Sequence, residues 1–160
     1  MNELNISAKI TVYSYDELSE VEKNLITAAR LSSAEAYAPY SHFWVGAAVL
    51  LANGEVLTGN NQENAAAPSG LCAERVTLFG THARFPDVPV QMMALAAQTR
   101  GAFTGSPITP CGACRQVILE SEMRFGQPIR LLMYGRDAVY VADTVQALLP
   151  LHFGQESLNG

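Results

Sequence analysis

The three cysteines of this chain lie in two short motifs, at residues 71–75 and 109–116. Two residues separate Cys111 from Cys114, a spacing that places both sulfurs on one face of the first turn of a helix. Cys72 opens a second predicted helix and can add a third thiolate. Three protein ligands leave one position of a tetrahedral metal open, which is typical of a catalytic zinc site. We therefore predict that Cys72, Cys111 and Cys114 bind Zn²⁺.

Glu74 follows Cys72 by two residues, so its side chain leaves the helix on a different side from the sulfur. A water molecule at the open position of zinc is acidified to a pKa of about 7. A carboxylate that reaches this water without binding the metal can act as a general acid and base. Three thiolates with a non-ligating glutamate are the ligand set of the zinc deaminases. The pattern thus predicts Glu74 as the proton carrier of a hydrolytic deamination.

Three other interpretations of the cysteines compete with a catalytic zinc. Cys111 and Cys114 could form a redox pair, although such a pair needs no third cysteine beside a glutamate. A structural zinc could take His42, His82 or His152 as its fourth ligand, but none has a short, ligand-like spacing from a cysteine. The cysteines could also be small buried apolar residues, which explains one cysteine better than three in two motifs.

Cys72-Ala73-Glu74-Arg75 and the motif at 110–116 resemble the cytidine deaminase family, specifically its small three-cysteine, homotetrameric, zinc-dependent branch. The resemblance runs from about Ala38 to Phe153, and paired motifs of this kind rarely coincide by chance. It implies hydrolytic deamination of cytidine and 2′-deoxycytidine to the uridines, with release of ammonia, in pyrimidine salvage. It also implies Zn²⁺ as cofactor and a homotetramer whose subunits share their active sites.

The resemblance also assigns substrate contacts. The segment Asn61-Gln62-Glu63-Asn64 resembles the family's ribose-binding motif. The resemblance implies that Asn61 and Glu63 hydrogen-bond the sugar hydroxyls. Phe43 is expected against the pyrimidine base. The tail phenylalanine, Phe153, is expected to reach a neighbouring subunit's site and close over the base. In full, the resemblance gives as substrate-binding residues Asn61, Glu63, Phe43, Ala73 and Phe153.

Arg75 is expected to offset the charge of the metal centre. Three thiolates on Zn²⁺ leave a formal charge of −1, which opposes acidification of the bound water. The positive ends of the helices that begin near Cys72 and Cys111 reduce this effect. The resemblance places Arg75 against a ligand sulfur, where it would add a charge-assisted hydrogen bond. The competing interpretation of Arg75 is an exposed helix residue.

Ala67 departs from the resemblance, because many family members have a tyrosine at this position, near the pyrimidine pocket. Loss of a large ring leaves space beside the base, and a site without a wall cannot exclude a larger group by shape. The sequence therefore suggests tolerance for substituents on N4 or C4 of the pyrimidine. Alternatively, Trp44, Pro68 or a shifted Phe153 fills the volume and specificity is ordinary.

Two other functions are consistent with the motifs. The enzyme could deaminate another cytosine-bearing compound, such as a blasticidin-type antibiotic. The chain could also be a zinc-stabilised binding module that has lost catalysis, although such a module has no use for Glu74.

Length and composition limit the possible classes of protein. The 160 residues suit one domain, here a single deaminase domain at 1–160, and 49% hydrophobic residues allow a sizeable core. The net charge is −5, and no run of Lys or Arg could follow a phosphate backbone, so nucleic acid is not an expected partner. The chain contains no apolar stretch of about 18 residues and no basic apolar leader, so we expect no membrane contact and a cytoplasmic location.

Periodicity and turn residues predict the order of the elements. Residues 1–15 should form an N-terminal arm or edge strand, and 150–160 a C-terminal tail. We expect helices at 16–36, 71–84 and 111–125, a hairpin of 43–51 with 55–58 around Asn53-Gly54, strands at 90–97, 128–134 and 138–141, and a last short helix reaching 149. Alternation of helices with short strands predicts an α/β fold, a three-layer α/β/α sandwich around a mixed five-stranded sheet.

Overall fold

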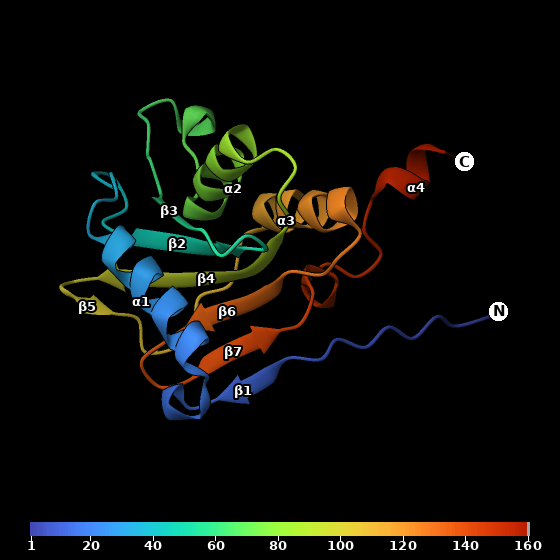
Figure 1. Cartoon of the computed structure of the whole chain (residues 1–160), viewed down its shortest axis with the longest axis horizontal. Helices are drawn as coiled ribbons and strands as arrows, with labels where there is room; N and C mark the ends of the chain where they lie inside the picture. Colours follow the sequence, from blue (N-terminus) through green and yellow to red (C-terminus); the bar gives the residue numbers. More distant parts are fainter. Residues whose placement is uncertain (160) are drawn as a thin grey trace.

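The computed structural model describes residues 1–159 and contains one mixed β-sheet (Figure 1). The strand order is β1-β7-β6-β4-β2-β3, and β5 pairs with β4. The pair β4–β6 is parallel, and the other pairs are antiparallel. The strands are β1 (Thr11–Tyr13), β2 (Trp44–Leu51), β3 (Val56–Asn60), β4 (Val90–Thr99), β5 (Ala102–Phe103), β6 (Arg130–Tyr134) and β7 (Val139–Ala142).

Helices cover both faces of the sheet, which confirms the three-layer α/β/α architecture. Helix α1 (Glu20–Ser33) lies on one face, and α2 (Ala73–Arg84) and α3 (Gly112–Phe125) lie on the other (Figure 1). The central strand β4 alternates between the layers: Ala94 joins the core under α1, and Met93 and Leu95 join the core under α2 and α3. A strand segment buried on both faces must be apolar, which explains the apolar run at 92–97 between Gln91 and Gln98.

The sheet contains seven strands, so the prediction of five was too low. The first additional strand is β1, which pairs with β7 in the register Thr11–Val141 and forms an edge of the sheet. The second is β5, a two-residue strand that folds back on β4. β1 lies within residues 1–15, where the sequence predicted an arm or an edge strand, whereas β5 is too short to show a period because two residues cannot display alternation.

The first predicted helix, at 16–36, was wrong at both ends. Ser14 and Glu17 do form a capping box, but it closes only the short 3₁₀ helix η1 (Tyr15–Glu17). A second capping box, of Ser19 with Glu22, starts α1 at Glu20. The helix ends at Ser33, before the extended segment that leads to Pro39.

The turn and cap predicted from glycine are confirmed. β2 and β3 pair as an antiparallel hairpin, and Gly54 in its turn has a φ of 85°. Gly126 ends α3 in the left-handed conformation, with a φ of 63°. The remaining elements are two further 3₁₀ helices and a short final helix: η2 (Ala67–Ser69), η3 (Val145–Leu148) and α4 (Gln155–Leu158).

Glycine brings α2 close to the sheet and so places the start of this helix. A Cβ atom built at Gly59 of β3 would lie 2.6 Å from the Thr77 hydroxyl oxygen and 3.0 Å from the Thr77 backbone nitrogen. No residue larger than glycine fits between β3 and α2 without displacing the helix. The helix therefore packs directly on β2 and β3, and its first residues lie beside the first residues of α3.

No helix within residues 1–159 is long and apolar enough to cross a membrane.

Candidate metal centre and substrate pocket

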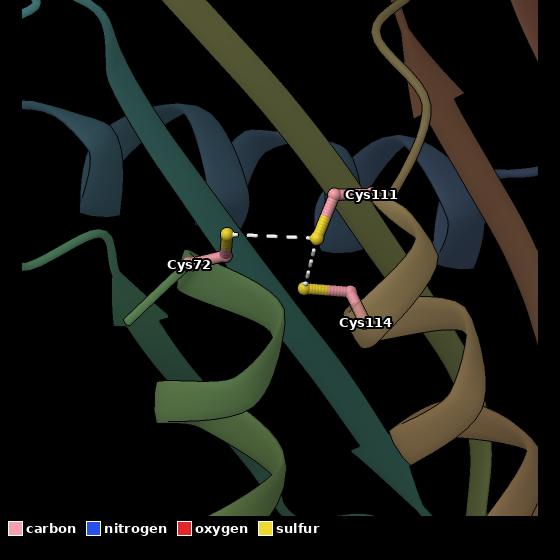
Figure 2. A group of neighbouring side chains, drawn as sticks. All are labelled: Cys72, Cys111 and Cys114. Atoms are coloured by element: carbon pink, nitrogen blue, oxygen red, sulfur yellow. Dashed lines mark hydrogen bonds between the residues drawn. The ribbon is translucent and has the colours of Figure 1, made fainter. Parts of the chain in front are cut away.

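The three cysteine sulfurs converge between the first turns of α2 and α3 (Figure 2). The Cys72 sulfur lies 3.8 Å from that of Cys111, and the Cys111 sulfur lies 3.4 Å from that of Cys114. Zinc–sulfur bonds of about 2.3 Å at tetrahedral angles separate two sulfurs by about 3.8 Å. The cluster therefore has the dimensions that a tetrahedral zinc ion requires.

Helix starts hold two of the ligands. Cys72 and Cys111 are the N-cap residues of α2 and α3, with extended backbone angles of −69°, 155° and −65°, 166°. Their backbone carbonyl oxygens accept the first bonds of each helix, from Val76 at 3.1 Å and Arg115 at 2.9 Å. Cys114 lies one turn into α3 and is buried. Both helix N-termini thus direct partial positive charge at the thiolates.

In the metal-free protein, the pKa values of the Cys72 and Cys114 thiols shift in opposite directions. A hydrogen bond with Cys114, helped by the nearby Arg75 guanidinium, lowers the pKa of the Cys72 thiol to about 5. The same interaction raises the pKa of Cys114, and burial raises it further. A thiol that ionises this readily is a ready metal ligand, because the thiolate is the form that binds the metal.

Glu74 is buried beside the cluster, with 4% of its surface exposed. Burial raises the pKa of its carboxyl group to about 7, and the charge on Cys72 contributes in the same direction. A carboxyl with a pKa near neutral can both take and give a proton at physiological pH. Its protonation behaviour therefore suits a proton carrier.

Arg75 lies between the metal cluster and a cavity. Its guanidinium is close enough to the Cys72 sulfur to favour the thiolate, although no well-formed hydrogen bond joins the two groups. Its Nε atom is buried, and it has no hydrogen-bond partner within residues 1–159. A buried donor without a partner is costly, so a metal-bound thiolate is a favourable acceptor for it.

A cavity of about 480 Å³ opens next to Cys72 and is large enough for a small organic molecule. Its wall of small side chains includes Ala65, Ala67 and Gly70, and polar groups face it from Asn61, Glu63 and Arg75. Its lining consists of Tyr40, Asn61, Gln62, Glu63, Asn64, Ala65, Ala67, Gly70, Leu71, Cys72 and Arg75.

Two predicted sugar-binding residues already bind backbone groups in this cavity. Asn61 Oδ1 accepts from the Val45 N–H at 2.8 Å, and its Nδ2 donates to the Phe43 carbonyl at 2.9 Å. Glu63 Oε2 accepts from the backbone N–H groups of Tyr40 and Ser41, at 2.8 and 3.3 Å. Hydrogen bonds from Ser41 and Tyr40 lower the pKa of Glu63, which keeps this carboxylate ionised. Its Oε1 has no hydrogen bond within the described part of the chain.

The other predicted substrate contacts do not line this cavity. Phe43 is half-buried immediately before β2. Ala73 is fully buried, so a contact from this residue would have to come from its backbone N–H at the start of α2. Phe153 is 61% exposed and lies in the C-terminal segment.

Within the part of the chain that the structure describes, no histidine joins the cysteines as the fourth ligand of a structural zinc. The cluster of possible ligands there contains Cys72, Cys111 and Cys114 and no histidine. His82 instead lies 2.9 Å from the Ser121 hydroxyl, and His152 lies 3.1 Å from the Leu149 carbonyl. A site of three cysteines leaves one tetrahedral position for water or substrate.

Comparison with known proteins agrees with this geometry. Residues 19–125, which include all three cysteines, match the family model "Cytidine and deoxycytidylate deaminase zinc-binding region". A cytidine deaminase of Sporosarcina psychrophila is 39% identical over 140 residues, covering 88% of this chain and 96% of that protein. One of Mycobacterium tuberculosis H37Rv is 38% identical over 117 residues, covering 71% and 84%. The crystal structure of cytidine deaminase from Burkholderia pseudomallei has a TM-score of 0.69 at 35% identity, covering 85% of this chain and 100% of that one.

The α/β/α fold and the three-thiolate centre define a zinc-dependent enzyme of the deaminase class. The chain belongs to the cytidine deaminase family. Its cofactor is zinc, and the cluster of Cys72, Cys111 and Cys114 is able to bind it.

Sequence reasoning missed three residues that build the site. Tyr40 binds Glu63 through its backbone N–H and lines the cavity. Arg115 and Gln116 follow Cys114 and bind backbone carbonyls of the C-terminal segment. Both belong to the recognised motif at 110–116, but a motif does not show which distant carbonyl a side chain will reach.

Proposed function

We propose that this enzyme deaminates cytidine and 2′-deoxycytidine by hydrolysis, giving uridine and 2′-deoxyuridine with release of ammonia. The observation that carries the proposal is the three-thiolate cluster with the buried carboxyl of Glu74 two residues from one ligand. The relatives that support it are named as cytidine deaminases.

Glu74 has the proton-carrying role in this mechanism. Zinc, when bound, supplies a Lewis acid that lowers the pKa of a water molecule to about 7. Glu74 takes one proton from this water and passes it to the ring nitrogen N3 while the water oxygen bonds to C4. Glu74 then carries the remaining proton of that oxygen to the amino group, so that the C4–N bond breaks, ammonia leaves and C4 keeps the oxygen as a carbonyl. A carboxyl with a pKa of about 7 in a buried site is suited to both directions of transfer. Arg75 and the two helix N-termini stabilise the thiolate charge of Cys72 and Cys111.

The sugar binds against the polar wall of the cavity. The free Oε1 of Glu63 accepts a ribose hydroxyl, while its Oε2 stays on the backbone of Tyr40 and Ser41. Asn61 contributes from the same wall. A carboxylate oxygen placed for a hydroxyl favours substrates that carry one, because an unpaired acceptor in a closed site is costly.

The same site accepts pyrimidine nucleosides that carry a substituent on N4 or C4. Ala65, Ala67 and Gly70 line the cavity with small side chains beside Cys72. Without a large ring at position 67, this side of the pocket has no wall that excludes an added alkyl or acyl group.

The active enzyme is a cytoplasmic homotetramer of single-domain chains, 1–160, that serves pyrimidine salvage. Phe153 is exposed on one chain and would complete the site of a neighbour by closing over the base. Phe43 and the backbone N–H of Ala73 contact the base from the chain's own side. The substrate is a free nucleoside, in keeping with a net charge of −5, and nucleic acid is not a partner.

A substrate panel tests the proposal. The zinc-loaded protein is incubated with cytidine, 2′-deoxycytidine, free cytosine and a blasticidin-type antibiotic, and loss of the 4-amino group is followed by ultraviolet absorbance. Turnover of the two nucleosides with much slower turnover of cytosine supports the proposal. Preferred turnover of the antibiotic would indicate the alternative enzyme, and no turnover of any compound would indicate a binding module.

A further inference from the structure

Two consecutive residues of α3 fasten the C-terminal segment to the metal-bearing helix. Arg115 Nη1 donates to the Leu148 carbonyl at 2.7 Å, and Gln116 Nε2 donates to the Phe153 carbonyl at 2.8 Å. Both residues directly follow the metal ligand Cys114. In Figure 1 the chain after β7 passes α3 on its way to α4.

The guanidinium of Arg115 also binds the loop before the metal motif. Its Nε donates to the Pro110 carbonyl at 2.8 Å, next to Cys111. The side chain thus joins the metal loop to the end of η3, and Gln116 extends the attachment by five residues to Phe153.

At Phe153 the backbone carbonyl is held by the bond from Gln116, and the residue is exposed. Phe153 as a whole residue is 61% exposed, whereas the next residue, Gly154, is buried. A Cβ atom at Gly154 would lie 2.5 Å from the Met123 methyl carbon, so the chain lies directly on α3 at this point. An anchored backbone with an exposed ring presents the ring in a fixed place.

The segment also contains a strained residue. Leu151 has a φ of 52°, in the left-handed region that a leucine rarely adopts. Such strain persists only when surrounding contacts determine the conformation. The hydrogen bonds from Arg115 to the Leu148 carbonyl and from Gln116 to the Phe153 carbonyl lie on either side of Leu151 along the chain and are contacts of this kind.

We propose that Gln116 is a positioning residue: its bond to the Phe153 carbonyl sets the place from which the phenylalanine ring reaches a substrate site. The proposal rests on the proposed function for the role of Phe153. Gln116 does not line the cavity beside Cys72, and its side-chain amide bonds the Phe153 carbonyl, so in this proposal it acts through the tail. Helix α3, which carries Cys114, thereby orders the C-terminal segment whose Phe153 completes a substrate site.

Amide hydrogen exchange of the zinc-loaded protein tests the attachment itself. Gln116→Met keeps the length of the side chain and removes the N–H donor. Loss of one such bond should speed exchange of the amides of residues 149–158 by about 10-fold, while exchange in β4 and the zinc content stay unchanged. The matched control is Glu120→Met, an exposed position on the same helix, which should leave the tail unaffected. Unchanged tail exchange in Gln116→Met would overturn the proposal.

A double-mutant cycle tests the route through Phe153. Gln116→Met and Phe153→Ala should each lower kcat/KM for cytidine, and the double variant should be no worse than Phe153→Ala alone. Losses that simply multiply would refute a positioning role. If the wild-type protein fails to deaminate cytidine, the proposed function fails, and the exchange experiment still decides whether Gln116 orders the tail.

Discussion

The side-chain amide of Asn61 donates a hydrogen bond to the backbone carbonyl of Phe43 at 2.9 Å, which joins two residues that were both predicted to contact substrate. The same side chain accepts from the Val45 N–H at 2.8 Å. Asn61 therefore shapes the start of β2 as well as the cavity wall. Its loss should affect stability and substrate binding together.

Asn61→Ala leaves the Phe43 carbonyl and the Val45 N–H without their partner. Partly buried backbone groups without partners cost about 1–3 kcal/mol, so we expect a lower free energy of unfolding and a raised KM for cytidine. Denaturant unfolding and steady-state kinetics measure the two effects. Ser32→Ala is the control, because the Ser32 hydroxyl bonds the Gly59 carbonyl at 2.9 Å and Ser32 does not line the cavity. It should cost stability without changing KM, and an unchanged KM in Asn61→Ala would argue against a role in binding.

Glu74→Gln keeps the shape of the side chain and removes the transferable proton. Loss of a general acid and base typically lowers turnover by about 10²–10⁴-fold, so kcat for cytidine should fall within that range. Zinc content and substrate binding should survive, which metal analysis and equilibrium binding can check. A variant with most of its turnover intact would exclude Glu74 as the proton carrier.

In the metal-free protein, the raised pKa of Glu74 should make the free energy of unfolding depend on pH. Burial raises this pKa to about 7 from the ordinary value of 4.5, so the folded state holds the proton more tightly than the unfolded state. The stability from this proton is fully present below pH 4.5 and is lost as the pH rises through about 7.

Glu74→Gln should therefore leave the apoprotein equally stable at pH 4.5 and more stable than wild type at pH 8, by up to about 3 kcal/mol. Chelator-treated samples in denaturant titrations at the two pH values give the comparison. A difference that is the same at both pH values would show that ionisation of Glu74 is not responsible.

Cys111→Ala should remove the metal and lower thermal stability as well. Zinc-binding energy contributes to folding when the site forms only in the folded chain. Metal content after dialysis and the Tm with and without added zinc measure the effect. Wild type should lose Tm on chelation, whereas Cys111→Ala should be insensitive to chelator; a chelator-sensitive variant would place the zinc elsewhere.

The sequence predicted the metal cluster well because its determinants are local. Cys111 and Cys114 share one helical turn, and Cys72 and Glu74 start another, so spacing alone orients the side chains. The alternation of helices and strands likewise predicted the three layers. Both depend on short-range periodicity.

The features that the sequence did not predict depend on contacts between segments that lie far apart in the chain. The pairing of β1 with β7 joins Thr11 to Val141, at opposite ends of the chain. The bonds of Glu63 to Tyr40 and of Gln116 to Phe153 join residues 23 and 37 positions apart. Spacing along a helix or strand carries no information about such pairs.

Ala67→Tyr tests whether the small-residue wall of the cavity sets the range of substrates. Ala67 lines the cavity beside Cys72, and a tyrosine ring there would reduce the space available next to the base. We expect wild type to process cytidine and an N4-alkyl or N4-acyl cytidine with similar kcat/KM, and Ala67→Tyr to lower the value for the substituted nucleoside by about 10-fold or more. Ala65→Ser, a small polar replacement in the same wall, is the matched control and should change neither value. If restoring a ring at position 67 leaves the ratio of the two values unchanged, Trp44, Pro68 or Phe153 fills the space, and the wall does not determine specificity.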